Sequence, residues 1–121
     1  MWCVPLSDDS SNPGEFTLPS GFVLAIGTDP AEDFIGPFGF RRDMQGQCTG
    51  VCFWPKVQHT NGMRTVHGGV LSTMADVSLC ALARDVVADA HIVTVSLQVD
   101  FVAAAPLGKW LLGTGEVIRR T

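Results

Sequence analysis

The segment from Gly69 to Arg84 limits the possible folds more than any other, because it has the periodicity of one long α-helix. Its apolar residues recur three or four positions apart, and they are Val70, Met74, Val77 and Ala81, flanked by Leu71 and Leu82. Between Gly68 and Ala83 the only charged residue is Asp76. Because a solvent-facing helix side normally carries several charges, we expect this helix to be buried on every side.

Asp76 lies nearly opposite the apolar stripe of this helix, on a wheel of about 100° per residue. Its neighbours on that side are small, namely Ser72, Thr73 and Cys80, so another backbone or subunit can come close. Burial of a lone carboxylate costs several kcal/mol unless the group is paired or used. The pattern therefore leaves two interpretations open: a functional carboxylate at a contact, or a structural one bonded to a hydroxyl or an arginine.

Alternating apolar residues predict the strands. A helical turn at Pro30–Phe34 precedes two candidate strands, Ile35–Arg42 and Gly46–Trp54, which read as a hairpin. His91–Val102 alternates strictly, which predicts a strand whose buried face carries Val93, Val95, Leu97, Val99 and Phe101. Lys109–Arg120 reads as a further strand, in which Gly113 and Gly115 permit a bulge or a close approach. The element order ββαββ predicts an α+β fold.

The length and composition bound the remaining choices. At 121 residues the chain is long enough for one domain, which we place at residues 21–121 after an N-terminal arm at 1–20. Only 17% of residues are charged, against about 25% in typical soluble domains, which suggests surface buried in an oligomer. The net charge of −4 argues against nucleic acid as a partner. Apolar runs are too short for a membrane span, and the start has no secretory signal pattern, so we expect a cytoplasmic protein.

The four cysteines are scattered, and we expect reduced thiols. Cys48 and Cys52 with the nearby His59 suggest zinc only weakly, because no second pair completes a tetrahedral set. We therefore expect no metal site.

Two consecutive glycines, Gly68 and Gly69, open the long helix. The first turn of a helix has unpaired N–H groups at the positive end of its dipole, and without side chains there a ligand can reach them. Such N–H groups can form an oxyanion site, although the glycines alone could serve only backbone geometry. His67, just before them, is expected to cap the helix rather than to act as a base. A serine-hydrolase elbow is absent from the sequence.

Taken together, several motifs resemble the hotdog-fold acyl-CoA thioesterases of the phenylacetate-degradation type, which are similar to 4-hydroxybenzoyl-CoA thioesterase. They are N-x-x-x-x-x-H-G-G at 61–69, the helix with Asp76, T-V-S-L-Q-V-D-F at 94–101 followed by P-L-G, the upstream F-I-G-P-F-G-F and the downstream G-E-V-I-R-R. The likeness spans residues 22–121. It implies a long helix wrapped by an antiparallel sheet, a homodimer that often forms a tetramer, and hydrolysis of acyl-CoA or aryl-CoA without metal or organic cofactor.

The resemblance also implies roles for individual residues. Asp76 matches the catalytic carboxylate, acting as general base or nucleophile, and the Gly68 N–H matches the group that polarises the thioester carbonyl. Asn61 matches a polar residue near the thioester, and Thr94 matches a residue that positions water. Substrate contacts are expected from His67 and Gly69. In such dimers Asn61 and Gly68 come from one subunit and Asp76 from the other.

The chain departs from this pattern after Arg119, Arg120 and Thr121, where relatives continue with two more strands. In the sheet of the relatives, those two strands lie between the strands that we predict at 91–102 and 109–120. We therefore expect a hotdog sheet that lacks them, in which the 91–102 strand has one unpaired side. Relatives also tend to bind the CoA phosphates with basic residues of this region. Arg119 and Arg120 are candidates for that contact, and an exposed basic strand end is the alternative.

Two other functions remain open. A non-catalytic acyl-CoA binding or dimerisation module would keep the pocket without turnover. The enoyl-CoA hydratase branch of the same fold needs a histidine acting with a carboxylate, and neither His59 nor His67 has its usual spacing from an aspartate. The acyl group is not fixed by the sequence, although Phe34, Phe38, Phe53 and Trp54 could line an aromatic pocket or belong to the core.

Overall fold

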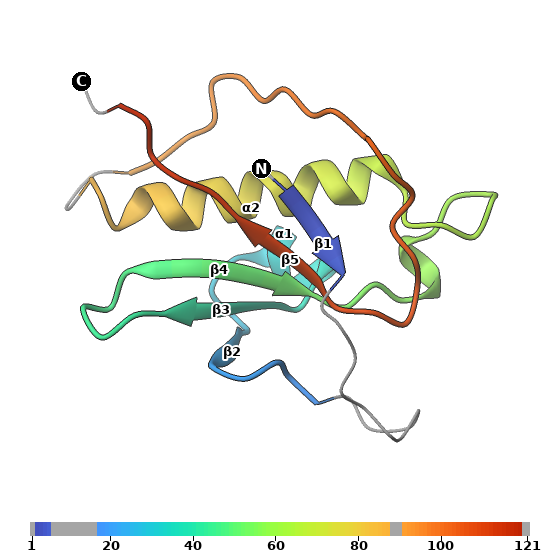
Figure 1. The fold of residues 1–121 in the computed structure, drawn as a ribbon, viewed down its shortest axis with the longest axis horizontal. Helices are drawn as coiled ribbons and strands as arrows, with labels where there is room; N and C mark the ends of the chain where they lie inside the picture. The colour runs from blue at the N-terminus through green and yellow to red at the C-terminus, as the bar shows by residue number, and fades with distance from the viewer. Residues whose placement is uncertain (1, 6–16, 88–90, 120–121) are drawn as a thin grey trace.

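A computed structural model of the chain describes residues 2–5, 17–87 and 91–119, and these form a five-stranded antiparallel sheet with one long helix against it (Figure 1). The sheet order is β1-β5-β4-β3-β2. Its strands are β1 (Trp2–Pro5), β2 (Phe22–Ala25), β3 (Phe38–Arg42), β4 (Cys48–Phe53) and β5 (Leu111–Thr114). The helices are α1 (Pro30–Ile35), the short 3-10 helix η1 (Val57–His59) and α2 (Gly68–Arg84). None of these helices is both long and apolar enough to cross a membrane.

The predicted helices and hairpin are confirmed. The α1 helix begins at Pro30 because Asp29 caps it, accepting from the N–H groups of Ala31 and Glu32 at 2.9 and 3.1 Å. Strands β3 and β4 pair antiparallel across the turn that follows Arg42, with a register shift between Arg41 and Arg42. The α2 helix covers the predicted span and one residue more at its start.

The main core lies between α2 and the sheet. Helix α2 contributes its buried residues Met74, Ala75, Val77 and Ser78, and the sheet contributes Phe38, Val51, Phe53 and Leu111. Gly113 lets β5 approach α2, because a Cβ there would overlap the Ser78 Oγ. The predicted close approach at this glycine is confirmed. A second cluster, around Phe22, Cys52 and Trp110, also holds Trp54, whose ring lies edge-on to Trp110 at 5.2 Å.

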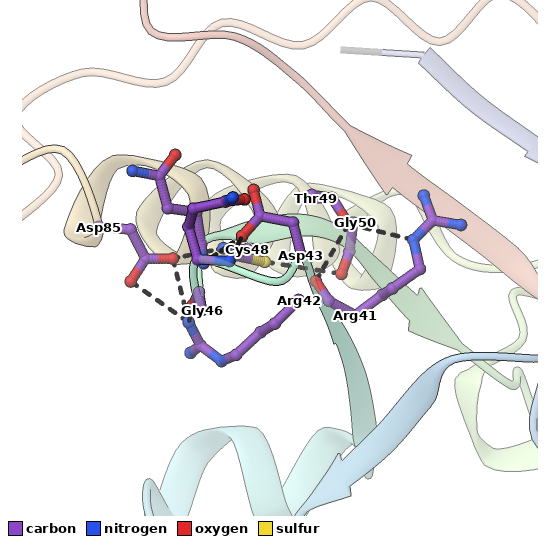
Figure 2. A network of polar contacts seen from close by, with 10 residues as sticks. Arg41, Arg42, Asp43, Gly46, Cys48, Thr49, Gly50 and Asp85 are labelled. Atoms are coloured by element: carbon purple, nitrogen blue, oxygen red, sulfur yellow. Dashed lines mark hydrogen bonds and ion pairs between the residues drawn. The ribbon is translucent and has the colours of Figure 1, made fainter.

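The hairpin is also fastened to the C-terminal end of α2 by the polar network of Figure 2. Asp85, the C-cap residue of α2, accepts from the backbone N–H of Cys48 and forms an ion pair with Arg42 at 3.0 Å. The same guanidinium donates to the carbonyl of Gly46 at 2.7 Å. One carboxylate therefore fixes the turn of the hairpin against the last turn of the helix.

The strand predicted at His91–Val102 is wrong, since the structure shows no strand there. The segment runs beside α2, away from the sheet (Figure 1). Its alternating residues are open to solvent, since Val93 is 78% exposed and Val95 95%. A strand needs a neighbour for its N–H and C=O groups. Among the described residues no strand lies beside this segment, because β1 takes the second edge of β5.

Three other predictions need correction. The last strand is shorter than Lys109–Arg120 and covers only Leu111–Thr114. The arm predicted at 1–20 contributes β1, which pairs with β5, while residues 6–16 lie outside the described part. Helix α2 is not buried on every side within one chain, because the side that carries Asp76 and Cys80 is partly exposed, and Leu79 is 37% exposed. The cause is that a single sheet can cover only one face of a helix.

Candidate active site

The start of α2 presents one backbone donor to a ligand. His67 is the N-cap, and its Nδ1 accepts from the N–H of Gly69 at 2.9 Å. The N–H of Gly69 is thus already used, and the expected cap is confirmed. Among the described residues nothing accepts from the N–H of Gly68. Gly68 therefore places a free donor at the positive end of the helix dipole.

Asn61 organises the loop in front of this donor. Its Oδ1 accepts from the N–H groups of Met63 and Thr65 at 2.9 and 3.2 Å, and its Nδ2 donates to the Thr65 Oγ1 at 3.0 Å. The loop is joined to the helix start by a bond of 2.8 Å from the N–H of His67 to the carbonyl of His59. Hydrogen bonds therefore join the loop that carries Asn61 to the helix start that carries Gly68.

A cavity of about 300 Å³ connects Asn61 and Gly68, since both line it. The other walls are apolar and come from two parts of the chain: Val66 and Leu71 beside the helix start, and Phe101 to Ala105. The N–H of Val66 donates to the carbonyl of Ala105 at 3.0 Å, which attaches this second wall to the loop. A polarising N–H and an amide beside an apolar chamber suit a small acyl group with its carbonyl oxygen at the helix start.

Asp76 and Thr94 form a second pair. The Thr94 Oγ1 donates to the Asp76 Oδ1, and the Cys80 Sγ lies 3.5 Å from the same hydroxyl. Within the described ranges, Asp76 has no ion pair with a lysine or arginine. Its carboxylate is thus held by a hydroxyl and remains only partly buried, so it can accept a proton from water or attack a carbonyl.

The two pairs do not converge within one chain. Gly68 and Asp76 are eight residues apart on α2, which separates them by about 12 Å along the helix axis. Neither Asp76 nor Thr94 lines the cavity that Asn61 and Gly68 share. The chain therefore carries two half-sites, defined here as Asn61 with Gly68 and Asp76 with Thr94.

Glu32 on α1 is a neighbour of Asp76 that the sequence did not indicate. Burial is the main cause that raises the pKa of its carboxyl, and the charges of Asp29, Asp33 and Asp76 raise it further, while Arg84 lowers it. In the sequence it is an ordinary acidic residue in the first turn of a short helix. Only tertiary packing brings it within electrostatic reach of Asp76.

The remaining candidates are structural or peripheral. His59 is 4% exposed, and its Nδ1 accepts from the N–H of Lys56 at 2.8 Å. Burial raises the pKa of the Cys52 thiol to about 12 and also raises that of Cys48, so neither is a ready thiolate ligand. No three His, Cys, Asp or Glu residues gather as metal ligands in the described part of the chain.

The structure does not connect the predicted phosphate contacts with the cavity. Arg119 is exposed on the segment after β5 and does not line the cavity. Arg120 lies outside the described residues.

Comparison with known proteins places this architecture in a class. The thioesterase superfamily model matches residues 63–121, a span that contains Gly68, Asp76 and Thr94. The chain belongs to the thioesterase superfamily, and its long helix against an antiparallel sheet is the hotdog fold.

A particular relative extends the match toward the N-terminus. The chain is 40% identical over 95 residues to a Pseudomonas aeruginosa protein named "Putative esterase PA0474". The match covers 78% of this chain and 70% of the relative. Membership of the superfamily supports hydrolysis of a thioester as the class of reaction.

Proposed function

We propose that this protein hydrolyses acyl-CoA or aryl-CoA thioesters, with no metal or organic cofactor. Asp76 activates water or attacks the thioester carbonyl, and the Gly68 N–H stabilises the negative charge that develops on the carbonyl oxygen. Thr94 orients the carboxylate and the water, and Asn61 contacts the thioester. The observation that carries the proposal is the hydrogen bond from the Thr94 hydroxyl to the Asp76 carboxylate. Among the described residues, no lysine or arginine forms an ion pair with this carboxylate.

The separation of the two half-sites supports a shared active site. A symmetric pair of chains would bring the Asn61 and Gly68 of one subunit against the Asp76 and Thr94 of the other. The exposed side of α2 that carries Asp76 and Cys80 is available for such a contact in the single chain. We therefore propose a homodimer, which could pair again into a tetramer, as the active form.

The substitution Asp76→Asn tests the chemistry. It keeps the size of the side chain but removes the base, so we expect the release of free thiol from acyl-CoA to fall by roughly a thousandfold or more. The measurement is colorimetric thiol release, with the unfolding temperature checked to confirm an intact fold. The matched control is Glu116→Gln, which neutralises an exposed carboxylate after β5 and should leave turnover unchanged.

Full activity of Asp76→Asn would overturn this mechanism. If the wild-type protein binds acyl-CoA in a calorimeter but releases no thiol, the non-catalytic binding module is the correct function instead.

A further inference from the structure

The Phe101 ring lies against Gly68, the residue whose N–H is the proposed oxyanion donor. A Cβ built on Gly68 would lie 3.3 Å from the Phe101 Cζ and 3.6 Å from each Cε. The glycine therefore lets an aromatic ring rest on the first turn of α2. Because Gly68 and Phe101 line the same cavity, an acyl group that reaches the Gly68 N–H from this cavity can pack against that ring.

The cavity around this ring is suited to a small apolar group. Its lining is apolar at Val66, Leu71, Phe101 and the alanines at 103–105, and polar at Asn61 and Gly68. A cavity of roughly 150 Å³ with apolar walls holds one benzene molecule, and this cavity has about 300 Å³. One aromatic ring or a short aliphatic chain fits between its walls together with the thioester, whereas a long fatty acyl chain would extend beyond them.

The exposure of Phe101 indicates that its ring is incompletely packed in the chain alone. The side chain is 56% exposed although it forms a cavity wall. A ligand can therefore cover ring surface that the protein leaves open, and aromatic pairs contribute about 0.5–1.5 kcal/mol beyond the area that they bury.

We propose that Phe101 is a specificity-determining residue that selects ring-sized apolar acyl groups by packing against them beside Gly68. This inference rests on the proposed thioesterase function and extends it to the identity of the acyl group. The acyl chain lies between the Phe101 ring and the wall at Val66 and Leu71. The CoA portion extends out of the cavity into solvent.

The test compares kcat/KM for acetyl-, hexanoyl-, benzoyl- and palmitoyl-CoA in the wild-type protein, Phe101→Ala and Phe101→Leu. We expect the wild type to prefer benzoyl- and hexanoyl-CoA. Phe101→Ala should lower kcat/KM for benzoyl-CoA by about tenfold and leave acetyl-CoA unchanged. Phe101→Leu, which keeps apolar bulk without the ring, should retain hexanoyl-CoA and lose benzoyl-CoA. The matched control is Phe34→Ala, since Phe34 is 89% exposed on α1 and does not line the cavity.

The outcomes separate this inference from the function on which it rests. If no acyl-CoA is hydrolysed by the wild type, the proposed function is wrong. If thioesters are hydrolysed but Phe101→Ala and Phe101→Leu both keep the wild-type order of substrates, the role of Phe101 is wrong and the thioesterase function stands. A wild-type preference for palmitoyl-CoA would also overturn the assignment of a ring-sized subsite.

Discussion

Asp76 and Asp85 lie on the same helical segment and differ in how far their contacts commit them to the fold. Asp85 accepts from a backbone N–H and from a guanidinium, so its oxygens are committed to the fold. Among the described residues, the Asp76 carboxylate accepts only from the hydroxyl of Thr94, a residue on the segment that lies outside the sheet. A carboxylate that is held at one oxygen keeps the other available to a ligand, which is the arrangement that a general base or a nucleophile needs.

The buried imidazole of His59 leads to a prediction about how the free energy of unfolding depends on pH. Burial lowers the pKa of its imidazole from the usual 6.5, and the carbonyl of Ile35 only partly opposes this. Below a pH of about 6.5 the unfolded chain takes up a proton at this residue that the folded chain resists. The free energy of unfolding should therefore fall as the pH drops from that value toward the lowered pKa.

The measurement is urea unfolding at pH values of about 7.5 and about 5.5. We expect the loss of stability on acidification to be smaller in His59→Gln than in the wild type, whatever the absolute stability of the variant. His91→Gln, a change at an exposed histidine, should keep the wild-type dependence. Equal loss in the wild type and in His59→Gln would show that protonation of His59 does not couple to folding.

At the scale of elements, the position of α2 on the sheet depends on two different kinds of contact. Apolar packing holds its Met74 and Val77 face against β4 and β5. The carboxylate of Asp85 fixes its C-terminal end to the turn between β3 and β4 (Figure 2). The helix can thus neither rotate nor slide without losing one of them, and this fixes where Gly68 and Asp76 stand.

Two substitutions separate the backbone contact of Asp85 from its ion pair. Asp85→Ala leaves the N–H of the buried Cys48 without its acceptor, so we expect a loss of about 1–3 kcal/mol in the free energy of unfolding. Arg42→Ala removes the ion pair and the exposed hydrogen bond to the Gly46 carbonyl but keeps the contact of Asp85 with Cys48. Because the arginine side chain is 47% exposed, we expect a loss below about 1 kcal/mol. Denaturant unfolding of both variants measures the difference. Equal losses would mean that the contacts of Arg42, and not the bond from Asp85 to the Cys48 backbone, stabilise this junction.

For the whole molecule, the proposed sharing of the active site between subunits can be tested with heterodimers purified through two different tags. Asn61→Asp and Asp76→Asn each disable one half-site, and the aspartate at 61 keeps the oxygen that accepts from Met63 and Thr65. A heterodimer of these two variants should recover about half of wild-type activity, because one of its two sites is intact.

The reciprocal heterodimer is the matched control. It joins a wild-type chain to a chain that carries both substitutions, and it should be inactive if each site takes its halves from different chains. If each chain contained a complete site, the results would be reversed: the first heterodimer would be inactive and the second half-active. Purification through both tags itself reports whether the protein forms dimers, because only a dimer carries the two tags together.

The sequence by itself determined the long helix, the solitary Asp76, the glycines at the helix start and the β3–β4 hairpin. These features follow from local periodicity and turn chemistry, which act over a few residues. The motifs also indicated the hotdog fold and the class of thioester hydrolase. Only the tertiary structure decided which predicted strand finds a partner: β1 joins the sheet although its segment has no clear pattern, and 91–102 stays outside although it alternates strictly.

The same division holds for the candidate site. Asn61, Gly68, Asp76 and Thr94 could be chosen from motifs, but their separation into two pairs could not, nor could Phe101 over Gly68 or Glu32 near Asp76. Each of these relations joins residues from elements that are distant in the sequence. Strand pairing and site geometry are decided by which surfaces meet in the folded molecule, because hydrogen bonds and packing need a partner that local sequence does not specify.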